Sequence, residues 1–414
     1  MEKILVIAES INVEDSSGSK ANVALIKNLH QAGFELMVYH YTRQEIKLTD
    51  IPCFAIKENR RSLNFFLSRI ERRLRKDLKI DLHCLLENLF GFSFTLLNDR
   101  DSIAESIREI EGFIPHYILT LSKGGSFRPH QALLKIPELH SKWIAYMHDP
   151  YPMHLYPPPF AWVEPGQFKK WQFVKEISER AAFSAFPSEL LMKWMGSYFS
   201  EFLRSGIIIP HQISNQKNRE VELPEFFDSS KFNILHAGTL LEPRDPEPLV
   251  KSFLIFLKKY PSASNKVNLI FAGNSSVHEI FLKKISSNNE NIHFFPKGLP
   301  FVQVQKMQEL SSVNVILEAK SDISPFLPGK FPHCVKADRP ILLLGPDLSE
   351  SKRLLGDDYT YWSRVEDQER ITNLLEKLYL LWKGSPKNMK LNRKDLEKYL
   401  SSAYLKKAIQ NLSR

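Results

Sequence analysis

The sequence has little cysteine and no long apolar run. Its only cysteines among 414 residues are Cys53, Cys84 and Cys334, and they lie far apart in the chain. Thiols this few and this scattered exclude a disulfide framework and a cysteine-based zinc site, and they fit a reducing, cytoplasmic compartment. No stretch approaches the roughly 20 consecutive apolar residues of a membrane-spanning helix. The apolar stretch at residues 4–8 meets Glu9 too soon for a signal peptide, so none is expected.

Charge and composition narrow the range of partners. Hydrophobic residues make up 43% of the chain and charged residues 25%, which predicts a large core in two or three folded domains. The formal net charge of +9 fits nucleic acid, an anionic membrane surface or anionic small ligands. The sequence lacks a recognisable module of basic residues interleaved with exposed aromatics, so no specific nucleic-acid partner is expected.

The first half of the chain alternates apolar strands with amphipathic helices. Residues 4–8 and 36–39 have the pattern of buried strands, and apolar residues recur at helical spacing between them. This β-loop-α-β order predicts a doubly wound α/β domain. The loop at residues 15–20 carries Gly18 and Ser19 just before the helix, and it is either a ligand-facing turn or a flexible surface loop.

A histidine–aspartate pair ends another predicted strand. Residues 143–147 are apolar, and His148, Asp149 and Pro150 follow them. Because ligands of open α/β sheets bind beyond the carboxyl ends of the strands, His148 and Asp149 are candidates for a reaction centre. The alternative is a hydrogen-bonded structural histidine. The proline- and aromatic-rich residues 151–160 are either the wall of an acceptor site or a packed loop.

The second half repeats the pattern of strand, glycine, loop and helix. An apolar stretch within residues 232–239 and predicted strands at residues 267–274 and 292–295 indicate a second doubly wound domain. Arg244 follows the first of them, and an arginine suits phosphate oxygens because its planar fork makes two parallel bonds. The alternative is a surface arginine that pairs with a neighbouring acid.

The segment at residues 325–340 combines a loop, a lysine and a short helix. A proline- and glycine-rich loop leads to Lys330, and a helical pattern begins near His333. A turn and the apolar residues 341–344 follow. Backbone N–H groups and a lysine at the start of a helix suit an anion such as a diphosphate. The alternative is an ordinary helix–strand connection with a solvated lysine.

A basic stretch lies within a predicted insertion at residues 58–112. Residues 60–79 carry eight positive charges against two negative ones, with Phe and Leu side chains among them. Such a helix is typical of an element on an anionic membrane surface, and a packed helix with a solvated basic face is the alternative. The string Asp99-Arg100-Asp101 is interpreted as a helix start with Asp101 as N-cap, and no metal site is expected.

The order of these landmarks resembles that of GT-B nucleotide-sugar glycosyltransferases, especially glycosyltransferase family 4. That family commonly has Lys-x-x-Glu-Tyr-Leu-Ala-Ala-Gly-Lys-Pro-Ile where this chain has residues 330–341. His333 takes the place of the glutamate, Asp338 that of the glycine and Arg339 that of the second lysine. The positions in register are Lys330, Ala337, Arg339, Pro340 and Ile341; the other landmarks are Gly18, His148, Pro210-His211, Gly238, Arg244 and Gly273.

The resemblance implies the GT-B fold, in which two doubly wound Rossmann-like domains face a central cleft. It implies an N-terminal acceptor domain at residues 1–212 and a donor domain at 213–395, joined by a linker at 212–222. A C-terminal helix within 396–414 is expected to cross back to the first domain.

The resemblance also implies a retaining, metal-independent transfer from a nucleotide diphosphate sugar, without a cofactor. The acceptor would be a glycan or a lipid-linked sugar in cell-surface polysaccharide synthesis, with the enzyme cytoplasmic or peripheral at the inner face of the membrane. The first of two family glutamates falls at Pro325, so a catalytically impaired binding protein is the alternative. The implied donor-binding residues are Gly18, Ser19, Gly238, Thr239, Arg244, Gly273, Asn274, Lys297, Gly298, Leu299, Lys330 and His333, with His148 and Asp149 at the sugar.

Overall fold

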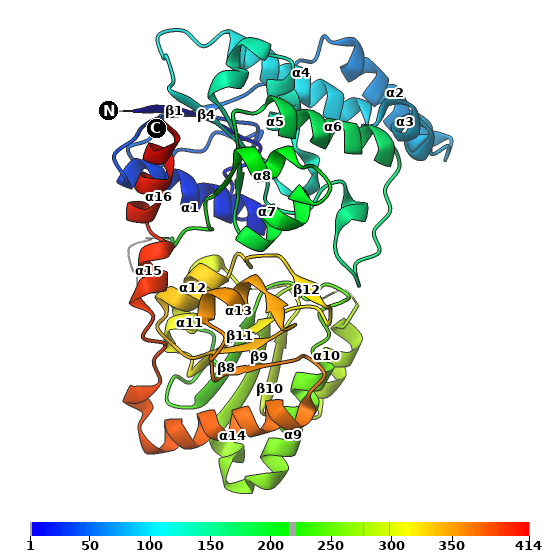
Figure 1. Ribbon diagram of the computed structural model, residues 1–414. Coiled ribbons are helices and arrows are strands. Elements are labelled where there is room, and N and C mark those ends of the chain that lie inside the picture. Colours follow the sequence, from blue (N-terminus) through cyan, green and yellow to red (C-terminus); the bar gives the residue numbers. More distant parts are fainter. Residues whose placement is uncertain (1, 215–220, 276, 298, 414) are drawn as a thin grey trace. The chain divides into compact units, whose positions relative to one another are not determined.

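The computed structural model describes residues 2–214, 221–275, 277–297 and 299–413. They form two compact units, each with its own parallel sheet between helices (Figure 1). The predicted α/β class with two doubly wound halves is confirmed. Gly298 and most of the predicted linker, residues 215–220, lie outside the described residues. Unit 1 comprises Met1–Tyr156, Phe160–Gln212 and Ser401–Arg414, and unit 2 comprises Pro157–Pro159 and Ile213–Leu400.

Unit 1 contains a seven-stranded parallel sheet in the order β3-β2-β1-β4-β5-β6-β7. The register places Val6 beside Val38 on one side and beside Leu119 on the other. These central strands are almost wholly apolar because helices cover both faces of the sheet. The strands are β1 (Lys3–Ala8), β2 (Glu35–His40), β3 (Cys53–Ala55), β4 (Tyr117–Leu121), β5 (Trp143–Tyr146), β6 (Phe183–Phe186) and β7 (Gly206–Ile208).

The alternation of side chains along β1 divides the core of unit 1 into two layers. Ile4 and Val6 pack with α1 and α16, whereas Leu5 and Ile7 pack with α4, α5 and α6. The helices are α1 (Ser17–Gln31), α2 (Leu63–Asp77), α3 (His83–Phe90), α4 (Phe94–Arg108), α5 (Arg128–Leu134), α6 (Gln167–Arg180), α7 (Glu189–Gly196), α8 (Glu201–Ser205) and α16 (Ser402–Gln410).

The structure corrects two predictions about α4. The helix begins at Phe94, and the hydroxyl of Ser93 caps it by accepting from the Leu96 N–H at 3.3 Å, so Asp101 lies in the middle of the helix and is not its N-cap. Buried residues of α4 belong to the core of the sheet, so the whole of 58–112 is not an insertion. Within residues 58–112, α2 and α3 precede this crossover helix.

Unit 2 contains a six-stranded parallel sheet in the order β10-β9-β8-β11-β13-β15. A separate parallel pair, β12 and β14, joins Ser324 to Ser349. The strand order reverses between β8 and β11, which makes their carboxyl ends the expected place for a ligand. The strands are β8 (Phe232–Ala237), β9 (Val267–Ala272), β10 (Ile292–Phe295), β11 (Val313–Leu317), β12 (Ile323–Ser324), β13 (Ile341–Leu344), β14 (Leu348–Ser349) and β15 (Trp362–Ser363).

Two long helices, α9 and α14, cover the main core of unit 2 with aromatic side chains. Phe253 and Phe256 of α9 and Tyr379 of α14 are buried against β8 and β9. None of the helices in the described part of the chain combines the length and apolar composition that a membrane crossing requires. The helices are α9 (Glu247–Lys259), α10 (Glu279–Ser287), α11 (Phe301–Leu310), α12 (Phe331–Lys336), α13 (Glu350–Leu355), α14 (Gln368–Gly384) and α15 (Lys394–Tyr399).

Asp338 lies in the turn between α12 and β13, at the position where glycosyltransferase family 4 commonly has glycine. Asp338 has a φ of 51°, in the left-handed region that favours glycine and tolerates aspartate or asparagine. Its carboxylate accepts from the Asn392 N–H at 2.8 Å and pairs with Lys390 at 3.5 Å. An aspartate therefore replaces the glycine with local hydrogen bonds that hold the turn.

We expect Asp338→Val to lower the free energy of unfolding by about 1–3 kcal/mol, because a β-branched residue adopts this backbone conformation poorly. Asp338→Asn keeps the side-chain acceptor and should cost less than about 1 kcal/mol. Urea unfolding of the two variants measures both effects. Equal destabilisation of the two would contradict the role of backbone conformation.

Candidate functional site

Two glycine turns bring the ends of β8 and β9 together in unit 2. The Gly238 N–H donates to the carbonyl of Ala272 at 2.8 Å, and the Leu240 N–H donates to that of Asn274 at 2.9 Å. A Cβ at Gly273 would lie 2.2 Å from the Gly238 carbonyl oxygen, and a Cβ at Gly238 would lie 3.0 Å from the Lys330 side chain. Only glycine permits this approach, and it places the half-buried Gly238 beside Lys330.

Positive charge is concentrated at this edge. Lys330 Nζ lies 3.2 Å from Nε2 of the buried His236. Burial and the nearby Lys330 and Arg244 cations lower the pKa of His236, so the ring is neutral and its Nε2 accepts from the lysine. Burial and Arg244 also lower the pKa of Lys330 to about 7. Among the described residues the polar contact of Lys330 is with the neutral His236 and no carboxylate pairs with it, so an anion here would relieve repulsion between the two cations.

A buried glutamate that the sequence analysis missed lies at the same edge. Glu318 directly follows β11, and its side chain accepts from the Ser351 hydroxyl at 2.7 Å. A Cβ at Gly345 would lie 2.5 Å from Glu318 Oε2, so the glycine makes room for the carboxyl group. Burial raises the pKa of Glu318 to about 7, although serine hydroxyls and Arg244 oppose the change. The signal in the sequence that could have identified it was a glutamate directly after an apolar strand.

The raised pKa of Glu318 predicts a loss of stability as pH increases. The folded state binds this proton up to about pH 7, whereas the unfolded state releases it near 4.5, so stability falls between these values. We expect a contribution of about 3 kcal/mol to the difference between pH 4.5 and pH 8. Glu318→Gln should lack it in urea unfolding at the two pH values.

The exposed Glu366 provides a matched control in unit 2. Glu366→Gln should keep the pH dependence of the native chain. If Glu318→Gln also keeps it, the buried carboxyl group does not cause it.

His333 lies on α12 and contacts α11. Its ring packs edge-on against Phe301 with centroids 5.3 Å apart, and its Nδ1 lies 3.5 Å from Gln305 Nε2. The helix begins at Phe331, earlier than the predicted start near His333. His333 is therefore one turn from Lys330, at the position where the family has a glutamate.

The remaining predicted donor residues of unit 2 occupy its loops. Thr239, Asn274 and Lys297 are exposed, and Leu299 packs at the edge of a small core around Phe227. Arg244 is half-buried in the loop after β8, close enough to Lys330, His236 and Glu318 to shift their pKa values. The structure thus brings together Gly238, Arg244, Gly273 and Lys330.

In unit 1 a buried asparagine fixes His148. Nε2 of His148 lies 2.9 Å from Asn22 Oδ1, while Asn22 Nδ2 donates to the carbonyls of Ser10 and Ser122. Because the Asn22 oxygen can only accept, Nε2 of His148 carries the proton and Nδ1 carries a lone pair. Burial and the neighbouring His211 and His130 keep the pKa of His148 low. The side chain is a neutral ring with one nitrogen able to accept.

The other predicted residues of unit 1 lie near strand ends. Asp149 follows His148 and is half-buried. Gly18 and Ser19 lie in the first turn of α1, not in the loop before it, and the Ser16 hydroxyl caps this turn by accepting from the Ser19 N–H at 3.1 Å. A Cβ at Gly18 would touch the backbone of Lys123 and Gly124. Among the described residues no cluster of His, Cys, Asp and Glu has metal-ligating geometry.

Solved structures share this fold at low sequence identity. The trehalose-phosphate synthase of Burkholderia xenovorans, solved with glucose-6-phosphate, has a TM-score of 0.64 at 10% identity, with 100% of both chains covered. HepE of Anabaena, solved with UDP and glucose, has a TM-score of 0.59 at 9% identity, with 100% of both covered. The Escherichia coli trehalose-6-phosphate protein bound to UDP-2-fluoro glucose has 0.60 at 11%, with 100% of this chain and 99% of that one covered.

No family model and no curated protein sequence matches the chain. The structural likeness extends over the whole chain, and it confirms the predicted GT-B fold. At identities near 10% it establishes the fold alone, and membership of family 4 stays a prediction.

Proposed function

We propose that the chain is a glycosyltransferase that takes a sugar from a nucleotide diphosphate donor. The observation that supports this most is the pair of close cations, Arg244 and Lys330, beside the glycine turns at the end of β8. The two GT-B structures named above with UDP or a UDP-sugar show what donors this fold binds elsewhere. The proposed donor of this chain is likewise a sugar nucleotide, and no cofactor is invoked.

The chemistry follows from the charge that develops on the leaving diphosphate. Arg244 would hold phosphate oxygens with its fork, and Lys330 would add a point charge that the diphosphate itself stabilises. The backbone of Gly238 and Gly273 would let phosphate approach closely. His148 would accept a hydrogen bond from a sugar hydroxyl at Nδ1, with Asp149 beside it. The transfer would be retaining and metal-independent.

The proposed acceptor is a glycan or lipid-linked sugar, as in cell-surface polysaccharide synthesis. His333, at the place of a family glutamate, would accept from ribose hydroxyls through a neutral ring nitrogen. The second candidate is a binding protein with this fold that has lost turnover. The replacement of both family glutamates, at Pro325 and His333, favours this alternative.

We expect the chain to transfer or hydrolyse the sugar of at least one nucleotide diphosphate sugar in a panel, and to bind UDP. Arg244→Gln should weaken UDP binding about tenfold or more, because it removes charge-assisted bonds. Binding should weaken as pH rises above 7, where Lys330 loses its proton. Lys330→Arg keeps the charge and should remove this pH dependence. Isothermal titration calorimetry measures these effects.

Arg364→Gln is a matched control, because this exposed arginine of unit 2 pairs with Asp347. It should leave UDP binding unchanged. UDP binding without turnover of any donor would favour the binding-protein alternative. Equal effects of the Arg244 and Arg364 variants would overturn the proposed phosphate site.

The proposal includes peripheral attachment of this otherwise cytoplasmic chain to the inner face of an anionic membrane through α2. Leu63, Phe66 and Ile70 follow one another at helical spacing and are 74%, 55% and 54% exposed. Exposed cations, including Arg73 and Lys76, lie on the same helix. Apolar side chains would enter the headgroup region while the cations meet anionic lipid. The basic helix does not bury its whole apolar face against unit 1.

In flotation with vesicles containing phosphatidylglycerol, we expect Phe66→Ser with Ile70→Ser to lose most of the bound fraction. Arg73→Gln with Lys76→Gln should do so most strongly at low salt, because charge attraction is screened. Ile114→Ser is the matched control, since Ile114 is 78% exposed outside the helix. Unchanged flotation of both double variants would contradict the membrane role.

A further inference from the structure

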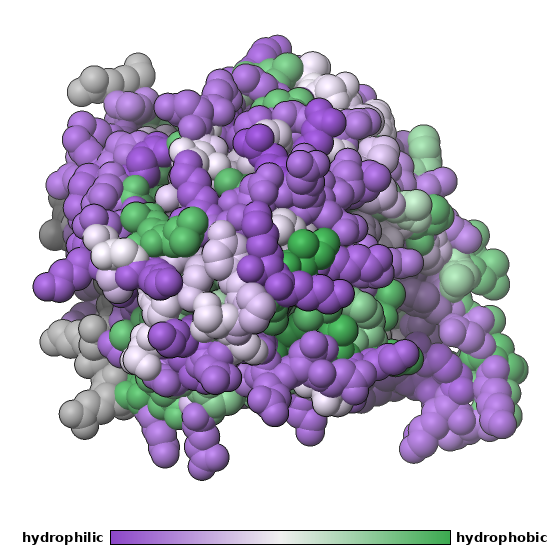
Figure 2. Space-filling model, turned by 90° about the horizontal axis from the view of Figure 1, so that it is seen from below, coloured by the Kyte–Doolittle hydropathy of each residue, from purple (hydrophilic) through white to green (hydrophobic). Residues whose placement is uncertain are grey.

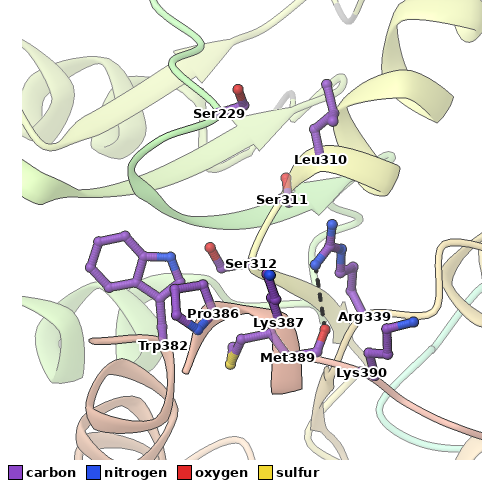
Figure 3. A pocket seen from close by; sticks show the side chains of 10 residues that line it. All are labelled: Ser229, Leu310, Ser311, Ser312, Arg339, Trp382, Pro386, Lys387, Met389 and Lys390. Carbon is purple, nitrogen blue, oxygen red and sulfur yellow. Dashed lines mark hydrogen bonds between the residues drawn. The ribbon is translucent and has the colours of Figure 1, made fainter. Parts of the chain in front are cut away.

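Unit 2 contains a cavity of about 500 Å³ that the donor site does not use (Figure 3). Its lining includes Ser312, which directly precedes β11, and Arg339, which lies two residues before β13. Parallel strands have their amino ends at the same edge of a sheet, opposite the carboxyl ends that carry Gly238 and Glu318. The cavity is therefore at the far edge of the same sheet from the proposed donor site.

The charged residues that line this cavity are all basic. Arg339, Lys387 and Lys390 line it, and none of the ten lining residues is an aspartate or a glutamate. Arg339 donates to the carbonyl oxygens of Glu309 at 3.0 Å and Met389 at 3.5 Å, and within the described residues it has no carboxylate partner. Figure 3 shows Arg339 and Lys387 extending into the space between the lining segments. Because Lys390 pairs with Asp338 at 3.5 Å, an anion would find the guanidinium group of Arg339 and the ammonium group of Lys387 there.

A tryptophan supplies the apolar wall. Trp382 at the end of α14 contacts Phe232 and Tyr379, with ring centroids 5.6 and 5.9 Å apart, and is half-exposed where it lines the cavity. Flat aromatic faces bind the C–H faces of sugar rings. Figure 2 shows the molecule from below relative to Figure 1, and on this face the surface is mostly hydrophilic, with apolar side chains in separate small groups. A cavity that combines basic side chains with one aromatic wall suits a small ligand with a charged end and a ring.

We propose that this cavity is a second binding site, for a phosphorylated monosaccharide. The phosphate contacts Arg339 and Lys387, whose donors match its oxygens, and the sugar ring lies on Trp382. The volume falls within the range of about 300–1,000 Å³ typical of small-molecule sites. The site does not depend on the proposed donor chemistry, because no residue is shared between the two edges.

Calorimetry on the full chain, without UDP and with excess UDP, tests this site, with mannose 6-phosphate, inorganic phosphate and mannose as probes. We expect mannose 6-phosphate to bind at least tenfold more tightly than inorganic phosphate or mannose alone. Lys387→Gln and Arg339→Gln should each weaken it about tenfold, the size of one charge-assisted contact. The Lys387 side chain is exposed, so its variant tests the site without threatening the fold.

Lys383→Gln is the matched control, because Lys383 is an exposed lysine of α14, next to Trp382 in the chain, that does not line the cavity. It should leave binding unchanged. Equal binding of inorganic phosphate and mannose 6-phosphate would reduce the site to a phosphate site and overturn the sugar assignment. Equal effects of the Lys387 and Lys383 variants, or displacement of mannose 6-phosphate by UDP, would overturn the proposal itself.

Discussion

The proximity of two cations, Lys330 and Arg244, is the physical constraint on which the proposed function depends. Bringing like charges together and partly burying one of them costs free energy, seen in the lowered pKa of Lys330. His236 beside them is neutral, and Arg244 also acts on the buried Glu318, whose pKa it lowers against the effect of burial. The proposed diphosphate, beside two glycine turns, would relieve the repulsion between the two cations.

The sequence predicted the order of elements well because the strands are apolar on both faces. Val267–Ala272 and Ile341–Leu344 are buried throughout, and such runs have little alternative to a covered parallel sheet. The glycines after β8 and β9 were predicted as ligand-binding positions because ligands approach such sheets at the ends of the strands. Asp101 was assigned wrongly because an acid before a helical pattern also occurs in the middle of a helix.

The site itself was only partly predictable. Arg244 was predicted from its position after a strand and Lys330 from its position at the start of a helix, but Glu318 was missed because a glutamate after an apolar strand gives no sign of its partners. Ser351, which donates to it, lies 33 residues further along the chain. His148 was predicted as a group at a strand end, but its protonated nitrogen depends on Asn22, which is 126 residues away. Contacts across this distance come from the fold and have no local pattern.

One short segment supplies residues to both edges of the unit 2 sheet. Lys330 precedes α12, and Arg339 follows it, with the left-handed Asp338 fixing the direction of the chain between α12 and β13. A helix of six residues is about 9 Å long, so a change in the turn at Asp338 that displaces α12 would move both side chains. Variants of this turn therefore have to be tested for ligand binding at both edges of the sheet. Weaker donor binding by such a variant does not by itself show that the substituted residue contacts the donor.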